Sequence, residues 1–76
     1  MRYDLSKFPQ RLKQAREKRK LSKSKLMELT GIHPSTLSRY ETGESLPNTL
    51  NLIILAEILG VSLEWLCGGE YNESDI

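Results

Sequence analysis

The chain has 76 residues, a net charge of +1 and a single cysteine. This length fits one small domain, and Cys67 alone excludes an intramolecular disulfide, which favours a reducing compartment. The apolar run from Leu50 to Leu59 is too short to span a bilayer. The N-terminus also lacks the pattern of a signal peptide. We therefore expect a soluble, cytoplasmic protein with no membrane partner.

The small net charge conceals a strong asymmetry along the chain. Residues 1–25 contain ten Lys and Arg residues and two acids, whereas residues 26–76 contain Arg39 as their one base and eight acids. A basic half beside an acidic half favours a polyanionic partner on one face. A solvated, lysine-rich first helix is the alternative, which the charges alone leave open.

A first helix is expected after a short N-terminal arm, beginning at about Lys7. Pro9 falls in its first turn, where proline is tolerated. The helix ends in the basic run 18–20, whose positive charges suit a helix C-terminus. Its apolar residues recur at helical spacing and are Phe8, Leu12 and Ala15.

Residues 22–43 predict two short helices joined by a tight turn. Ser22 can cap the first helix and Gly31 can end it in left-handed backbone. Pro34 suits the start of the second helix, which Gly43 closes. Two helices joined by a short turn containing glycine form a helix-turn-helix, whose second helix can lie in the DNA major groove. The expected bounds are about Lys23 to Thr30 and Pro34 to Thr42.

Three basic side chains of this motif are candidate phosphate ligands. Lys23 and Lys25 lie in a first turn, where the helix dipole prefers acids, so a phosphate there would satisfy both the lysines and the free amides. Ordinary surface lysines are the alternative. His33 precedes the second helix and could donate to a phosphate, although a lone histidine in a turn often serves as a cap or lies at the surface.

The second helix of the motif separates apolar from polar residues. Ile32, Leu37 and Tyr40 can turn inward. The outward side chains include Arg39, which can pair bidentately with guanine, and hydroxyls that suit bases or phosphates. An ordinary exposed helix face is the alternative. The polar set consists of Ser35, Thr36, Ser38 and Arg39.

The stretch from Arg11 to Leu66 resembles the lambda-repressor/Cro-like helix-turn-helix family in the order and spacing of many residues. The resemblance implies a compact all-α domain of five helices that binds DNA operators, usually as a dimer, and regulates transcription. The matching positions are Arg11-Leu12-Lys13, Arg16, Leu21-Ser22, Leu26, Gly31-Ile32, Ser35 to Gly43, Pro47, Leu52 to Leu55 and Leu59 to Leu63.

The resemblance also implies roles for single residues. It assigns base contacts to Pro34, Ser35, Ser38 and Arg39. It assigns phosphate contacts to Lys23, Thr36 and the loop that includes Thr42 and Ser45, to which Lys25 and His33 are added from the residues themselves. It assigns a structural ion pair to Arg16 and Glu41. Pro34 has no side-chain donor, and Glu44 would repel a phosphate unless it points away.

The fourth helix, expected from Asn48 or Thr49 to Leu59, is apolar on two faces. One face suits the core, and the other needs a second burial surface. Ser62 should cap a short fifth helix, from Leu63 to Cys67, in which Trp65 and Leu66 cannot both point inward. We therefore predict a homodimer interface, with cover by the arm or the tail as the alternative. The core face consists of Leu52, Leu55, Ala56 and Leu59, and the interface of Leu50, Ile54, Ile58 and Trp65.

The sequence predicts one DNA-binding domain, residues 1–67, and a flexible acidic tail, residues 68–76. The expected function is a sequence-specific transcriptional regulator, a repressor that binds a pseudo-palindromic operator in double-stranded DNA as a homodimer. An antitoxin-like or accessory protein-interaction module of the same fold is the alternative. With no second histidine and no nucleophile–base or acid pair, we expect no metal, cofactor, small-molecule substrate or enzyme activity.

Overall fold

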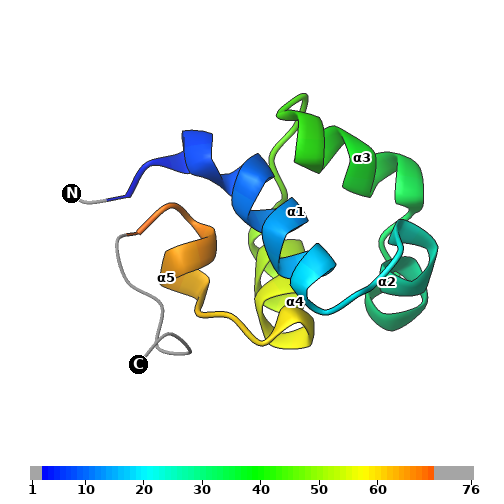
Figure 1. Ribbon diagram of the computed structural model, residues 1–76. Helices are drawn as coiled ribbons and strands as arrows, with labels where there is room; N and C mark the ends of the chain where they lie inside the picture. Colours follow the sequence, from blue (N-terminus) through cyan, green and yellow to red (C-terminus); the bar gives the residue numbers. More distant parts are fainter. Residues whose placement is uncertain (1–2, 70–76) are drawn as a thin grey trace.

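The computed structural model describes residues 3–69, and this part of the chain is helical without any strand (Figure 1). It confirms the expected all-α, five-helix fold. The predicted acidic tail lies, from residue 70 onward, outside the described residues. No helix within residues 3–69 is long and apolar enough to cross a membrane. The elements are the 3₁₀ turn η1 (Leu5–Lys7), α1 (Phe8–Lys18), α2 (Lys23–Thr30), α3 (Pro34–Thr42), α4 (Thr49–Leu59) and α5 (Leu63–Leu66).

The helix bounds follow from caps that are visible in the sequence. The Ser22 hydroxyl oxygen accepts a hydrogen bond from the backbone N–H of Lys25 at 3.0 Å, which begins α2. Gly31 ends that helix with φ +78°, a conformation that glycine adopts without strain. The turn η1 was not predicted. Asp4 caps it by accepting from the backbone N–H of Ser6 at 3.1 Å.

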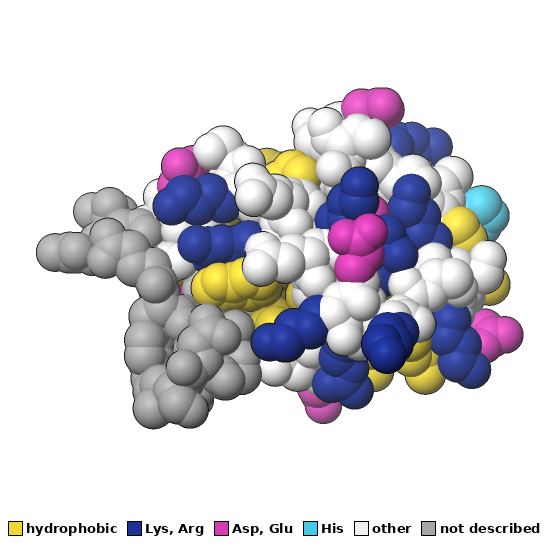
Figure 2. Space-filling model, in the orientation of Figure 1, with side chains coloured by type: hydrophobic (Ala, Val, Ile, Leu, Met, Phe, Trp, Pro, Cys, Tyr) yellow, Lys and Arg dark blue, Asp and Glu magenta, His cyan; other side chains and the backbone are white. Residues whose placement is uncertain are grey.

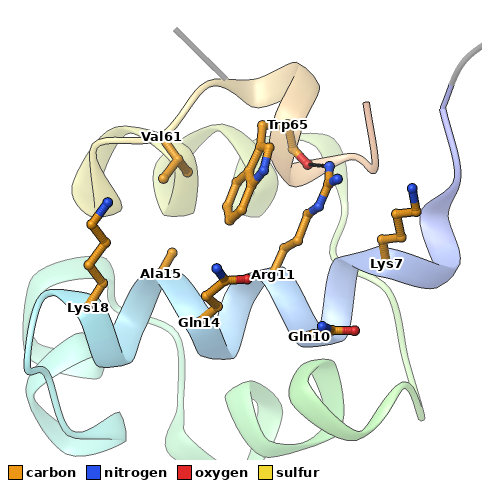
Figure 3. A pocket seen from close by; sticks show the side chains of 8 residues that line it. All are labelled: Lys7, Gln10, Arg11, Gln14, Ala15, Lys18, Val61 and Trp65. Atoms are coloured by element: carbon orange, nitrogen blue, oxygen red, sulfur yellow. Dashed lines mark hydrogen bonds between the residues drawn. The ribbon is translucent and has the colours of Figure 1, made fainter. Parts of the chain in front are cut away.

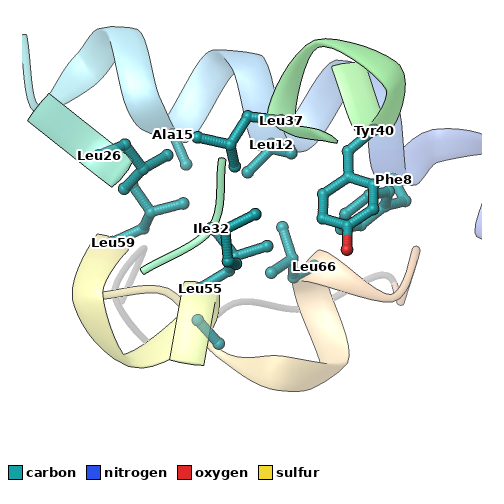
Figure 4. Packing of buried hydrophobic residues seen from close by; sticks show 11 residues of the cluster. Phe8, Leu12, Ala15, Leu26, Ile32, Leu37, Tyr40, Leu55, Leu59 and Leu66 are labelled. Atoms are coloured by element: carbon teal, nitrogen blue, oxygen red, sulfur yellow. The ribbon is translucent and has the colours of Figure 1, made fainter. Parts of the chain in front are cut away.

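The core lies where α1 and α3 pack together above α4 and α5 (Figure 4). Phe8 and Tyr40 meet edge to face, with ring centroids 6.0 Å apart, a geometry that aromatic quadrupoles favour. The Tyr40 hydroxyl accepts from the Asn51 side chain at 3.1 Å, so its polar end is satisfied. The buried residues are Phe8, Leu12, Ala15, Leu26, Ile32, Leu37, Tyr40, Leu55, Ala56, Leu59 and Leu66.

The two ends of the described chain meet on one side of the molecule (Figure 1). The backbone N–H of Asp4 donates to the Gly68 carbonyl at 3.2 Å, and both Gly68 and Gly69 are buried. The domain thus extends past the predicted boundary at residue 67, and these glycines are not the start of a free tail. Gly68 has φ +92°, and a Cβ atom there would overlap the Asp4 carbonyl group.

Cys67 is half-buried at the end of α5. Burial, and secondarily the nearby charge of Glu64, raises the pKa of its thiol. A thiol with a raised pKa is mostly protonated at neutral pH and is a poor nucleophile. Its environment therefore suits a packing residue.

The Gly68–Asp4 contact predicts unequal effects of two glycine substitutions. Gly68→Ala should lower the free energy of unfolding more than Gly31→Ala, because both sites have positive φ but only Gly68 has backbone in the space of a Cβ atom. We expect a loss of about 1–2 kcal/mol at Gly31 from the left-handed backbone. Urea unfolding measures both changes. An equal loss at the two sites would contradict the clamp between the chain ends.

Candidate nucleic-acid interface

The helix-turn-helix is fixed to the first helix by the predicted ion pair. Arg16 Nε lies 2.7 Å from Glu41 Oε2, and Arg16 Nη2 lies 3.1 Å from Glu41 Oε1. Arg16 Nη1 also donates to the Leu21 carbonyl at 2.8 Å. The two side chains are only 12% and 5% exposed, and the hydrogen bonds that Arg16 donates to the Glu41 carboxylate are the main cause of its raised pKa. One guanidinium thus joins α1, the loop before α2, and α3.

The two lysines at the head of α2 lie in different environments. Lys23 is half-buried, and its Nζ donates to Ser38 Oγ of α3 at 3.1 Å. Lys25 points outward and pairs with Glu28 at 3.1 Å, with both side chains more than half exposed. An exposed pair of this kind contributes little to stability. Lys23 therefore spans the two helices of the motif, whereas Lys25 remains free to approach a ligand from solvent.

The outer face of α3 presents polar groups from its first turn to its middle. Ser35 and Arg39 are exposed and lie four residues apart, which places them on the same helix face. Pro34, Thr36 and Ser38 are half-buried beside them. Because α3 is held from behind by its core residues and by the Glu41 ion pair, this face is presented on a fixed support.

His33 caps this helix. Its Nδ1 accepts from the backbone N–H of Ser35 at 3.1 Å and lies 2.8 Å from Ser35 Oγ. The cap interpretation of His33 therefore holds in this structure. Its imidazole lies at the entrance to α3 and is exposed.

The loop after α3 adds a second set of polar groups. The Thr42 hydroxyl donates to the Arg39 carbonyl at 3.2 Å, so it would have to change partner before donating to a phosphate. Glu44 is exposed, and Ser45 is half-buried. Beside this loop, Lys13 of α1 lines a groove together with Thr42 and Gly43.

In the sequence, Lys13 was named only as a position of the family resemblance, because only the packing of α1 on α3 brings it near the end of the motif. Lys and Arg side chains are spread over the face of the molecule in Figure 2, over α1 and α2. The basic character of the first part of the chain is therefore carried onto the surface beside the motif. The arrangement suits contact with a polyanion.

The residues predicted for a homodimer interface do not form one outward face. Ile58 and Trp65 pack against the core cluster. The ring of Trp65 faces α1, with the Arg11 guanidinium carbon 5.0 Å from the ring centroid (Figure 3). Arg11 also donates to the Trp65 carbonyl at 2.6 Å and to the Gly69 carbonyl. Trp65 is thus engaged within the domain.

The outward apolar residues of α4 are Leu50, 64% exposed, and Ile53, 44% exposed, with Ile54 half-buried next to them. Ile53 was missed because the predicted stripe followed a strict spacing of four residues. We call Leu50, Ile53 and Ile54 the α4 patch.

A family model described as helix-turn-helix matches residues 12–66. An uncharacterized HTH-type transcriptional regulator of Haemophilus influenzae is 38% identical over 66 residues, which cover 87% of this chain and 27% of that protein. The chain therefore spans about a quarter of the length of this curated relative.

Two solved structures share the fold. The P22 c2 repressor in complex with a synthetic operator aligns with a TM-score of 0.79 and 28% identity, over 83% of this chain and 96% of that one. The N-terminal DNA binding domain of SinR from Bacillus subtilis aligns with a TM-score of 0.77 and 30% identity, over 86% of this chain and 96% of that one.

The buried ion pair predicts a non-additive stability cycle. Arg16→Met should lower the free energy of unfolding by about 3 kcal/mol, because it leaves the Glu41 carboxylate buried without its partner. Adding Glu41→Leu should recover most of this loss, since no buried charge remains. Urea unfolding of the wild type, both single variants and the double variant measures the coupling. Additive losses would show that the two side chains do not act as a pair.

Proposed function

The chain belongs to the lambda-repressor/Cro-like helix-turn-helix family of DNA-binding transcriptional regulators, and we propose that it is a repressor that reads a specific operator through α3. The exposed face of α3, fixed by the Arg16–Glu41 pair, is the observation that carries this proposal. A helix held from behind can enter the major groove with a defined register. The repressor role is supported by the likeness to the P22 c2 repressor.

In this proposal the base contacts come from Pro34, Ser35, Ser38 and Arg39. Arg39 is exposed and is the last basic residue in the sequence. An arginine can bind guanine O6 and N7 with two hydrogen bonds. Pro34 offers only apolar contact, such as with a thymine methyl group. The other side chains, by their positions on α3, supply hydroxyl groups.

The phosphate contacts come from the groups around this face, which fix the orientation of the helix without reading sequence. Lys23 and Lys25 stand at the head of α2, where free amides and positive charge meet. The loop after α3 lies beside Lys13. The full proposed set is Lys13, Lys23, Lys25, His33, Thr36, Thr42 and Ser45.

We further propose that two copies bind a pseudo-palindromic operator as a homodimer. One short recognition helix reads only a few base pairs, and a dimer would place two such helices about 34 Å apart in successive major grooves. The α4 patch supports this proposal, because an exposed Leu50 and Ile53 on one helix leave apolar surface in water. The proposed interface is thus centred on Leu50, Ile53 and Ile54, and Ile58 and Trp65, which pack against the core, are no longer assigned to it.

Arg39→Ala tests base reading. After in vitro selection has identified the preferred operator, this substitution should weaken binding to it by about 1–3 kcal/mol, with little effect on random DNA. The matched control is Lys25→Ala, which should weaken both complexes alike and reduce the salt dependence of binding, because a phosphate contact releases counterions on any sequence. Fluorescence anisotropy measures each affinity. An equal loss on both DNAs for Arg39→Ala would refute its base-reading role.

The dimer is tested by a charge placed in the α4 patch. Leu50→Lys should shift the protein toward the monomer in sedimentation equilibrium, because a cation cannot be buried unpaired in an apolar interface. Leu29→Lys is the control, since Leu29 is also exposed, at 46%, but lies on α2. A wild-type chain that is monomeric at tens of micromolar, with and without operator DNA, would contradict the proposal. A stable complex with a different co-expressed protein through the same patch would instead support an accessory or antitoxin-like role.

A further inference from the structure

Ser38 has its hydrogen-bond polarity set by a neighbour on another helix. Lys23 Nζ lies 3.1 Å from Ser38 Oγ. An ammonium group has three donors and no acceptor, so the serine oxygen must accept this bond. The hydroxyl proton of Ser38 is then left to point toward another acceptor. Lys23 keeps two further N–H groups, which leaves its proposed phosphate contact possible at the same time.

Ser35 is in the opposite situation. The backbone N–H of Ser35 donates to His33 Nδ1 at 3.1 Å, and therefore this nitrogen carries its lone pair and the proton of the neutral ring is on Nε2. Ser35 Oγ lies 2.8 Å from the same Nδ1. Because an Nδ1 that accepts from the backbone N–H carries no proton, the serine hydroxyl can only donate to it, and the two donors share one lone pair. The lone pairs of Ser35 Oγ are then left to accept from outside.

We propose that Lys23 and His33 are positioning residues for specificity: Lys23 makes Ser38 a reader of base acceptors, and His33 makes Ser35 a reader of base amino groups. This inference rests on the proposed entry of α3 into the major groove. There guanine offers N7 and O6, and thymine offers O4, as acceptors, whereas cytosine offers only the N4 amino group and adenine offers N6 beside N7. Ser38 therefore favours guanine or thymine over cytosine, and Ser35 favours adenine or cytosine.

The chemistry explains why these serines are not interchangeable. A free serine hydroxyl rotates and can donate or accept, so it discriminates poorly between bases. Once its proton or its lone pair is engaged by a fixed partner, one of the two roles remains. Lys23 is a hydrogen-bond donor and His33 Nδ1 is an acceptor. Two identical serines on one helix face are therefore left with opposite roles toward the DNA, Ser38 as a donor and Ser35 as an acceptor.

The test compares the base preferences of the wild type and four variants by in vitro selection and by affinities for single-base variants of the selected operator. The positions read by each serine are those whose enrichment changes in Ser38→Ala and in Ser35→Ala. Lys23→Met should lower the preference for guanine or thymine over cytosine at the Ser38 position by about 3- to 10-fold, the range expected for one hydrogen bond. His33→Ala should lower the preference for amino-bearing bases at the Ser35 position by a similar factor. Each variant should leave the other serine's position unchanged.

Lys25→Met is the matched control, because it removes a lysine of the same helix turn whose ammonium group pairs with Glu28 of α2. It should weaken all sequences alike and keep both preferences. If Lys23→Met also weakens all sequences by one factor and keeps the preference at the Ser38 position, Lys23 is only a phosphate ligand and the inference is overturned. Enrichment of cytosine at the Ser38 position in the wild type overturns it as well.

These failures can be told apart from failure of the proposed function. A wild-type chain that enriches no sequence would contradict DNA reading by α3 itself, and the polarity inference would fall with it. A wild-type chain that enriches an operator, with preferences that do not depend on Lys23 and His33, would contradict the polarity inference alone. If Lys23→Met does not fold, Lys23→Gln gives the same comparison, since an amide can both donate and accept and should also relax the preference.

Discussion

The Arg16–Glu41 ion pair is the interaction on which the position of the recognition helix depends. It buries two opposite charges between α1 and α3, and the same guanidinium holds the backbone at Leu21, just before α2 begins. Removal of one partner from a buried pair lowers the free energy of unfolding strongly, because the remaining charge is left buried without a partner and without hydration. One side chain of the first helix, Arg16, therefore fixes the position of both helices of the motif. The outer face of α3 can then be polar and exposed without losing its orientation.

A second clamp, around Arg11, holds the other end of the domain. Its guanidinium lies over the Trp65 ring and donates to the carbonyls of Trp65 and Gly69. Beside it, the Asp4 backbone bonds to Gly68. Two arginines of α1, five residues apart, thus anchor two different parts of the chain: Arg16 holds the helix-turn-helix and Arg11 holds the C-terminal segment. This division explains how a domain with so small a core keeps both its motif and its C-terminal helix in place.

The sequence was sufficient for the helices, because their limits are set locally. Two serines, Ser22 and Ser62, cap the starts of helices, and three glycines, Gly31, Gly43 and Gly60, end helices. The observed bounds agree with the predicted ones to within about one residue. The resemblance to a known family supplied the Arg16–Glu41 pair, which spacing alone does not reveal. The burial of Gly68 could not be predicted from the local sequence, because two glycines in a row are typical of a linker. Only the packing of the N-terminal arm shows that they are buried.

The sequence predicted which residues belong to the candidate site, but not the hydrogen bonds between them. Lys23, Ser38, His33 and Ser35 were each singled out by type and position, yet the bonds between them depend on side-chain directions that no spacing rule supplies. The apolar faces of α4 showed the same limit, since Trp65 was expected outside and instead packs on Arg11.

The central claim is that α3 is the surface that meets DNA. It is tested most directly by recording backbone amide chemical shifts while double-stranded operator DNA is added. We expect the largest changes at the head of α2 and along α3 from Ser35 to Arg39. Changes confined to α4 and α5, with α3 unaffected, would contradict it.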